Sequence, residues 1–269
     1  LCCNEIAAQA GAQCGAQSHI NVKTGAKEVV QSGRIVNGIK VNPERYPFIV
    51  RIYYDDQFYC SGNIITPSHV LSLGVCFFYS APLLSRVSIY GGDTSPYSGG
   101  IAIPVTKISI HDKFKFVFNS YDFDVAVISV PINSFQGKTN MAPIPLQTSK
   151  VLPGSRCYVI GWGLSLNNYG NYMWNGLHYA TMNIVSQSAC SRSWASVNEN
   201  FITSNMICAK YCFGVDICYG DLGGPLVCDG KLTGIIGYTE YGCTKNNPAV
   251  FTRIMAPSIR SFIRNETGI

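Results

Sequence analysis

Residues 218–227 of this 269-residue chain read Cys-Tyr-Gly-Asp-Leu-Gly-Gly-Pro-Leu-Val, a glycine-rich loop that runs into an apolar stretch. This segment is one of four that together indicate the fold. The other three precede it in the chain: Arg34-Ile35-Val36-Asn37-Gly38, the frame from Cys60-Ser61-Gly62 to Val70-Leu71-Ser72-Leu73-Gly74-Val75-Cys76, and Asp124-Val125-Ala126-Val127.

The amino-acid composition and pattern of the chain change at Ile35. Before it, residues 11–34 are rich in Ala, Gln, Gly and Ser and have no strong apolar periodicity, which is typical of a flexible leader. After it, short β-rich runs such as 48–54 and 157–160 alternate with Gly, Pro, Asn and Ser turns, a pattern that favours an antiparallel sandwich or barrels. One helix is predicted from Pro257, because Ile259, Phe262 and Ile263 follow at helical spacing.

With Gly161-Trp162-Gly163 and the terminal helix, the four segments resemble the trypsin-like serine proteases across residues 35–269. The resemblance implies an all-β fold of two six-stranded antiparallel β-barrels with a C-terminal α-helix and a cleft between the barrels. It also divides the chain into a leader, 1–34, and a protease-like domain, 35–269. Within the leader, Ala8-Gln9-Ala10 has the small-residue spacing of a signal-peptide end, and a disordered propeptide is the alternative.

The resemblance also places the catalytic triad. In this family a serine attacks the carbonyl, a histidine takes its proton, and a buried aspartate orients the histidine. Asp124 stands at the aspartate position, whereas Val75 stands at the histidine position and Leu222 at the serine position. Neither valine nor leucine offers a lone pair, so we expect a pseudoenzyme that does not cut peptide bonds.

Two further features of the family depend on backbone or buried charge and are expected to persist. The oxyanion site would use the backbone N–H groups of Gly220 and Leu222. Cleavage after Arg34 would free the ammonium of Ile35, which by resemblance binds Asp221 and orders the surrounding loops. The chain could therefore be activated structurally while it remains chemically inert.

The specificity pocket is expected to be narrowed. Asp216 stands where trypsin-like enzymes keep the acid that binds a substrate Arg or Lys. The wall segment reads Gly237-Tyr238-Thr239, and Ala249 replaces a wall glycine, so Thr239 and Ala249 would intrude into the pocket. We therefore expect Asp216 to be solvated or bonded internally.

Twelve cysteines without paired zinc-ligand spacing indicate disulfides and hence a secreted protein. The resemblance implies four bridges, Cys60–Cys76, Cys157–Cys228, Cys190–Cys208 and Cys218–Cys243. Cys14 and Cys212 remain if the chain is cleaved after Ala10. They would pair with each other, Cys212 would form a disulfide-linked dimer, or Cys212 would be a free thiol.

Composition excludes several classes of partner. A net charge of +5, with basic residues scattered along the chain, gives no reason to expect nucleic acid binding. No apolar run reaches the length of a membrane span. We expect no metal and no cofactor, because the histidines are isolated and the stretch 85–100 holds only Asp93 as a carboxylate. Activity would require a relocated triad in which a displaced base, with His69 as the candidate, meets a nucleophile at hydrogen-bond distance.

An inert, secreted protease scaffold is best interpreted as a binding protein. The chain resembles the inactivated group 3 allergen protease paralogues of parasitic mites of the scabies type, which implies binding of host plasma proteins such as complement components. The alternatives are a weakly active endopeptidase with a displaced nucleophile or base, and a decoy for protease inhibitors or substrates. Aromatic side chains at 114–123 and 169–174 would form a partner surface or pack into the barrel, and Asn265 begins a glycosylation sequon.

Overall fold

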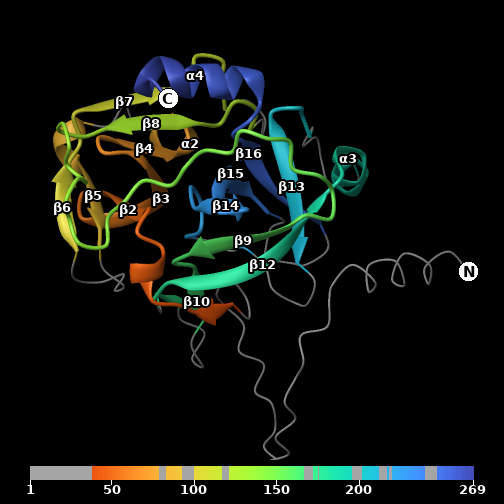
Figure 1. Ribbon diagram of the computed structural model, residues 1–269, viewed down its shortest axis with the longest axis horizontal. Coiled ribbons are helices and arrows are strands. Elements are labelled where there is room, and N and C mark those ends of the chain that lie inside the picture. Colours follow the sequence, from red (N-terminus) through yellow and green to blue (C-terminus); the bar gives the residue numbers. More distant parts are fainter. Residues whose placement is uncertain are drawn as a thin grey trace, which may run out of the picture.

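The computed structural model describes residues 38–269, with gaps at 79–82, 93–99, 117–120, 167–171, 175, 196–201, 212–216, 218–219 and 240–246. The leader predicted for residues 1–34 lies outside this part of the chain. The described residues form two antiparallel sheets that lie side by side (Figure 1). The predicted all-β fold of paired barrels with a C-terminal helix is therefore confirmed.

The first sheet contains seven strands in the order β6-β5-β2-β3-β4-β8-β7. The strands β6 and β7 follow one another in the chain but lie at opposite edges of the sheet, so this segment brings the two edges together. Alternation of apolar residues places one face inward, as in β5, where every second residue is buried. The bounds are β2 (Ile49–Tyr54), β3 (Gln57–Thr66), β4 (His69–Ser72), β5 (Val87–Gly91), β6 (Ile101–Pro104), β7 (Lys107–Ile110) and β8 (Ala126–Ser129).

The second sheet has the order β1-β12-β13-β16-β15-β14-β9, and an additional pairing of β12 with β9 closes it. The eight residues of β12 alternate strictly between buried and partly exposed positions. A separate hairpin joins β10 (Leu164–Leu166) to β11 (Tyr172–Trp174). The bounds are β1 (Ile39–Lys40), β9 (Arg156–Gly161), β12 (His178–Val185), β13 (Met206–Tyr211), β14 (Pro225–Cys228), β15 (Lys231–Tyr238) and β16 (Ala249–Arg253).

Each sheet holds one strand more than the predicted six. In the second sheet the extra strand is β1, two residues that pair with the beginning of β12. In the first sheet the segment 101–110 is divided at Val105-Thr106 into β6 and β7, which pair with different neighbours. The difference therefore comes from one short addition and one division, and it does not change the two-barrel arrangement.

The helix predicted from Pro257 is α4 (Pro257–Thr267), which ends at Gly268 in the left-handed conformation. Ile259 and Ile263 are fully buried, as their spacing predicts. Although α4 follows the second barrel in the chain, it packs across β7 and β8 of the first (Figure 1). The shorter helices are α2 (Val75–Phe78), α3 (Gln187–Trp194), and the 3-10 turns η1 (Pro43–Arg45) and η2 (Leu84–Arg86).

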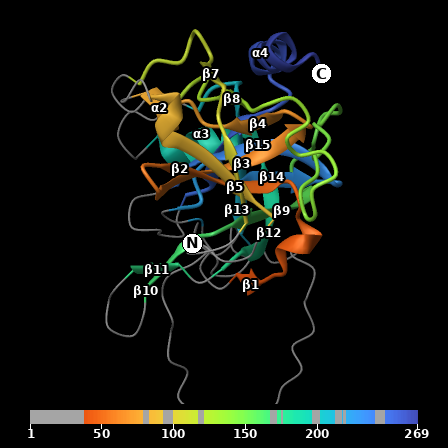
Figure 2. The same cartoon turned by 90° about the vertical axis from the view of Figure 1, so that its left-hand side faces the viewer.

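Three of the four predicted disulfides lie within the described residues and are formed, Cys60–Cys76, Cys157–Cys228 and Cys190–Cys208. The bridge Cys218–Cys243, together with Cys14 and Cys212, falls outside the described residues. In both views α4 lies at one end of the molecule and the β10–β11 hairpin at the other (Figures 1 and 2). No helix in the described ranges is long and apolar enough to cross a membrane.

Candidate functional site

The loop before β14 is held in one conformation by contacts with the first barrel. The backbone N–H of Ser61 donates to the carbonyl of Leu222 at 2.8 Å, and the side-chain amide of Asn63 donates to the carbonyl of Gly223 at 2.8 Å. Gly223 has a φ of +84°, and a Cβ there would lie 2.1 Å from the carbonyl oxygen of Ser61. Only glycine fits at this point, because the loop lies against the backbone of β3.

The loop also leaves two backbone donors unused. Gly220 has a φ of +94°. Neither the N–H of Gly220 nor that of Leu222 donates to another residue in the described ranges. In contrast, the N–H of Gly223 donates to the carbonyl of Ile236, and that of Gly224 donates to the carbonyl of Asp221. The two unused N–H groups are the ones for which an oxyanion site was predicted.

Asp221 is fully buried behind this loop. One of its carboxylate oxygens, Oδ1, accepts a hydrogen bond from the backbone N–H of Gly163 at 2.9 Å. The same oxygen lies so close to Gly161 that a Cβ on this glycine would overlap it. Asp221 therefore explains why glycine stands before Trp162. The predicted partner of Asp221, the ammonium of Ile35, lies outside the described residues.

Asp124 lies just before β8 and is only 1% exposed. Its Oδ1 accepts the backbone N–H of Val75 at 2.8 Å, and the backbone N–H of Gly74 also donates to the carboxylate. Its Oδ2 is buried and has no hydrogen-bond partner among the described residues. The hydroxyl of Thr252 donates to the backbone carbonyl of Asp124 at 2.7 Å, which ties the aspartate to β16.

The buried position changes the acidity of Asp124. Burial raises the pKa of this carboxyl to about 7, because the charged form loses its hydration, and the N–H groups of Val75 and Gly74 only partly offset the effect. A carboxylate with an unpartnered oxygen in an apolar site is costly to ionise. Val75 contacts this carboxylate through its backbone N–H, and its hydrocarbon side chain offers no hydrogen-bond partner.

Val75 begins α2, and the bridge from Cys76 to Cys60 fixes that turn against β3. Val75 and Leu222 are both partly buried, and both pack against the same hydrophobic cluster that fills the first barrel. The two side chains predicted to stand at the positions of the base and the nucleophile therefore extend an apolar core toward the surface.

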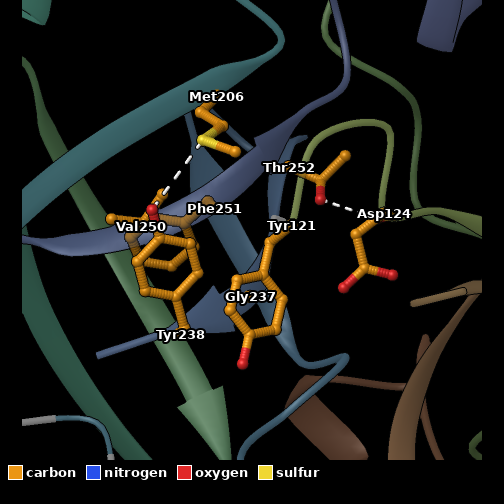
Figure 3. A pocket seen from close by; sticks show the side chains of 8 residues that line it. All are labelled: Tyr121, Asp124, Met206, Gly237, Tyr238, Val250, Phe251 and Thr252. Atoms are coloured by element: carbon orange, nitrogen blue, oxygen red, sulfur yellow. Dashed lines mark hydrogen bonds between the residues drawn. The ribbon is translucent and has the colours of Figure 1, made fainter. Parts of the chain in front are cut away.

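A shallow hollow, partly open to solvent and too small to enclose a water molecule, lies next to Asp124. Figure 3 shows it between the carboxylate of Asp124, the ring of Tyr121, and the residues Gly237 and Tyr238 at the end of β15. The rings of Tyr121 and Tyr238 lie 4.8 Å apart between centroids, and the hydroxyl of Tyr238 contacts the sulfur of Met206 at 3.9 Å. Burial raises the pKa of Tyr238, so its hydroxyl is neutral at physiological pH.

Only some of the residues predicted for the specificity pocket lie in the described part of the chain. Gly237 and Tyr238 line the hollow beside Asp124, Thr239 is partly buried, and Ala249 is 2% exposed where β16 begins. Asp216 lies outside the described residues, so the narrowed pocket stays a prediction. The described ranges contain no cluster of three or more His, Cys, Asp or Glu side chains that could hold a metal ion.

The three histidines among the described residues make their hydrogen bonds away from the Asp124 carboxylate. His69 begins β4, and its Nδ1 is 2.7 Å from the hydroxyl of Thr66. His111 follows β7 and contacts the hydroxyl of Ser258 through Nε2 at 3.0 Å. His178 lies in β12, with Nδ1 2.9 Å from the carbonyl of Gly176. Burial lowers the pKa of both His69 and His111.

The aromatic residues at 114–123 divide between packing and partial exposure. Phe114 is buried beneath Gly74, and Phe78 contacts its ring edge-on. The ring of Tyr121 packs at a tilt against Tyr238, and the ring of Phe123 packs at a tilt against His111. These contacts favour the packing interpretation for this segment. In the second aromatic segment, 169–174, no side chain is among those described.

Sequence reasoning missed the residues that position the site from a distance. Asn63 and Thr252 are buried polar residues on strands whose side chains hold the backbone of the loop and of Asp124, and Ser61 holds the loop through its own backbone N–H. The available signal was weak: a polar residue inside an apolar strand needs a hydrogen-bond partner when buried, but the sequence does not say which one.

Comparison with known proteins gives consistent results. A family model described as trypsin matches residues 35–263. Trypsin 5G1 of Aedes aegypti is 30% identical over 241 residues, which cover 88% of this chain and 86% of that protein. Trypsin of Xenopus laevis is 30% identical over 240 residues, which cover 87% and 91%.

Two solved structures resemble the whole described domain. Neuropsin, a serine protease of mouse brain, superimposes with a TM-score of 0.73 and 26% identity over 86% of this chain and 98% of its own. The scabies mite inactivated protease paralogue S-D1 superimposes with a TM-score of 0.73 and 23% identity over 86% and 97%. The second likeness is one of fold.

Proposed function

Because this chain belongs to the trypsin family, we propose that it keeps the family's scaffold without its hydrolytic activity and acts by binding another protein. The contact that carries the proposal is the one between Val75 and Asp124. The carboxylate is buried as the mechanism requires, but it receives only backbone N–H groups, and Oδ2 has no partner in the described part of the chain. A base held by this carboxylate is the element that the family's mechanism needs.

The reaction would also lack its nucleophile. Leu222 follows Asp221 in a loop where the N–H groups of Gly220 and Leu222 donate to no described residue, and these groups would stabilise an oxyanion if one formed. A leucine side chain cannot attack a carbonyl carbon. Removal of one triad member already removes most of the rate acceleration, so the replacement of two leaves only the residual effect of binding and the oxyanion site.

We include structural activation in the proposal. Cleavage after Arg34 would free the ammonium of Ile35, and Asp221 is a fully buried carboxylate that such a cation would pair with. The cleaved form would then have ordered loops around a narrowed specificity pocket with Asp216 at its base. A chain activated in this way would present its cleft and loops without cutting what they bind.

The proposed partner class rests on the inferred export of the chain and on its likeness in fold to an inactivated mite protease. Three formed disulfides are typical of an oxidising compartment and support export from the cell. An exported, non-hydrolytic trypsin homologue related in fold to an inactivated mite protease would meet host plasma proteins, and complement components are the class that we propose. A decoy for protease inhibitors would instead bind through the cleft.

The test combines a hydrolysis assay with a binding assay on purified protein cleaved after Arg34. We expect no turnover of a peptide library and no labelling by a fluorophosphonate probe, with an intact trypsin as the positive control. We expect saturable binding to a purified complement component, with serum albumin as the negative control. Labelling at a single serine that persists through purification would establish a displaced nucleophile and overturn the proposal.

A pair of variants distinguishes a protein that binds its partner through its peripheral loops from a decoy that binds through the cleft. Tyr238→Ala alters the wall of the cleft, whereas Ile132→Ser removes an apolar side chain that is 87% exposed on a turn after β8. Loss of binding in the first variant alone would indicate binding through the cleft, as expected of a decoy. Unchanged binding in both variants would assign the partner surface to other loops.

A further inference from the structure

The chain contains a single Asn-X-Ser/Thr sequence with X other than Pro, the tripeptide Asn265-Glu266-Thr267. It forms the last turn of α4, directly before the Gly268 cap. Asn265 is exposed to solvent, whereas its two neighbours are partly buried. The acceptor amide of the sequon is therefore the one member of the three that points away from the protein.

The neighbours of Asn265 are engaged in contacts that hold α4 on the first barrel. Glu266 accepts hydrogen bonds from the ammonium of Lys107 at 2.6 Å and from the hydroxyl of Ser109 at 2.7 Å, both on β7. These bonds lower the pKa of the Glu266 carboxyl, which is therefore ionised. The hydroxyl of Thr267 donates to the carbonyl of Ile263, one turn earlier, at 2.7 Å.

We propose that Asn265 is an N-glycosylation site and that the oligosaccharide is attached before α4 docks on the first barrel. The proposal rests on the export of the chain that the proposed function includes. In the transfer, Nδ2 of Asn265 forms a bond to the anomeric carbon of a lipid-pyrophosphate-linked oligosaccharide. The bond from that carbon to the pyrophosphate oxygen breaks, the lipid pyrophosphate leaves with the electron pair, and the amide nitrogen loses one proton.

The contacts of Glu266 and Thr267 explain the order of events. In the docked helix the tripeptide is helical, the Thr267 hydroxyl is already donated to Ile263, and Glu266 is bound to β7. A transferase that must reach the backbone and the hydroxyl of the tripeptide would have to break all three bonds. Before docking, a helix of eleven residues is marginal in water, so the tripeptide is accessible at that stage.

The position of Asn265 also limits where a partner can bind. The helix α4 lies at the end of the molecule opposite the β10–β11 hairpin in both views (Figures 1 and 2). An oligosaccharide on Asn265 would extend into solvent from that end without displacing Ile259 or Ile263, which face the core. The glycan would cover the outer face of α4 and leave the opposite end of the molecule accessible.

Occupancy is tested by producing the full chain behind a cleavable signal peptide in a eukaryotic cell line. The secreted protein is then treated with peptide-N-glycosidase in heavy-oxygen water and mapped by mass spectrometry. We expect Asn265 to be converted to Asp with heavy oxygen incorporated, and the gel shift to disappear in Asn265→Gln and Thr267→Ala. Thr267→Ser is the matched control and keeps the shift, because serine retains the hydroxyl.

An unmodified Asn265 in the secreted protein would overturn the proposal. Because the signal peptide is supplied, this result is independent of whether the natural chain is exported or hydrolytic, so the proposed function can fail separately. The order of events has its own test, in which unglycosylated protein is incubated with a purified transferase and its lipid-linked donor. We expect modification of the reduced, unfolded chain and none of the folded chain; equal modification of both would refute attachment before docking.

Discussion

At the scale of the residue, the side chain of Asp124 is buried, and only one of its carboxylate oxygens is hydrogen-bonded to a residue that the structure describes. Its pKa is raised from 3.8 to about 7, mainly by burial. A carboxyl whose pKa is higher in the folded than in the unfolded protein stabilises the fold when it is protonated. This stabilisation is fully present below the pKa of the unfolded state and is lost as the pH rises through the pKa of the folded state. We therefore expect this group to lower the stability between about pH 4 and pH 7, by on the order of 4 kcal/mol at about 1.4 kcal/mol per unit.

The substitution Asp124→Asn tests this expectation. Asparagine keeps an oxygen for the N–H of Val75 but cannot ionise, so the variant should be more stable than the parent at pH 8 and similar to it at pH 4. Urea unfolding at several pH values measures the difference. Asp56→Asn, on the exposed turn between β2 and β3, is the control and should leave the pH dependence unchanged. The same pH dependence in the parent and in Asp124→Asn would show that another group is responsible.

Gly223 gives a second prediction at this scale. An alanine there would adopt a φ of +84° and place its Cβ against the carbonyl of Ser61, so the loop would have to move. We expect Gly223→Ala to cost about 1–2 kcal/mol for the backbone conformation and about 1–3 kcal/mol more for the overlap. Gly230→Ala is the matched control, because Gly230 also has a positive φ of +72° but has open space around it. Equal losses in urea unfolding would show that the close approach to β3 is unimportant.

Sequence motifs propose which residues form the candidate site, but they do not predict the contacts that hold these residues in place. The order of the glycine-rich loop, Asp124 and Val75 could be read from motifs, because each motif is local in sequence. The support from Asn63 and Thr252 could not, since each reaches its partner from a different strand. The contact between the rings of Tyr121 and Tyr238 could not be predicted either. The alternation of apolar residues along a strand indicates which side chains face inward, but it does not indicate which of them contact each other.

At the scale of the element, α4 was predictable because its signals are local: a proline at the first turn and apolar residues at helical spacing. The division of 101–110 into β6 and β7 was not predictable, because it depends on which neighbour each half pairs with. The two-residue β1 has no pattern of its own and exists through its pairing with β12. Local patterns thus identify elements, and tertiary pairing decides their ends.

The docking of α4 leads to a prediction about Ile263. This side chain is fully buried in the cluster that fills the first barrel. Ile263→Ala should cost about 2–5 kcal/mol and Ile263→Val about 0.5–1.5 kcal/mol, because each leaves a cavity in proportion to the atoms removed. Arg264→Ala, on the exposed side of the same turn, is the control and should change the stability by less than about 0.5 kcal/mol. A small loss in Ile263→Ala would indicate that the helix end is not required for the folded state.

At the scale of the whole molecule, the proposed site is assembled from both barrels. Asp124 and Val75 come from the first barrel and the glycine-rich loop from the second, and the hydrogen bonds of Ser61 and Asn63 join the two. The backbone contacts that join the two parts of the proposed site therefore do not depend on which side chains occupy positions 75 and 222. The loss of hydrolysis that we propose would then depend on side-chain chemistry and on the pocket.

That distinction can be tested by restoring the missing groups. In the double variant Val75→His and Leu222→Ser, the new imidazole would face Asp124, and the new hydroxyl would stand in the retained loop. We nevertheless expect cleavage of an Arg-containing peptide at least about 10²-fold below that of an intact trypsin, because Thr239 and Ala249 would keep the substrate from its productive position. Fluorophosphonate labelling at position 222 checks that the introduced serine is reactive, so a weak rate can be assigned to substrate binding.

The matched comparison adds Thr239→Gly and Ala249→Gly to the double variant. If the walls of the pocket limit the rate, the quadruple variant should gain activity toward Arg-containing peptides, and its labelling by the fluorophosphonate probe should stay the same. Robust cleavage by the double variant alone would show that the pocket is open and that the interpretation of Thr239 and Ala249 is wrong. Failure of both variants to label would instead locate the defect in the loop, because the serine would then lack its base even with histidine beside Asp124.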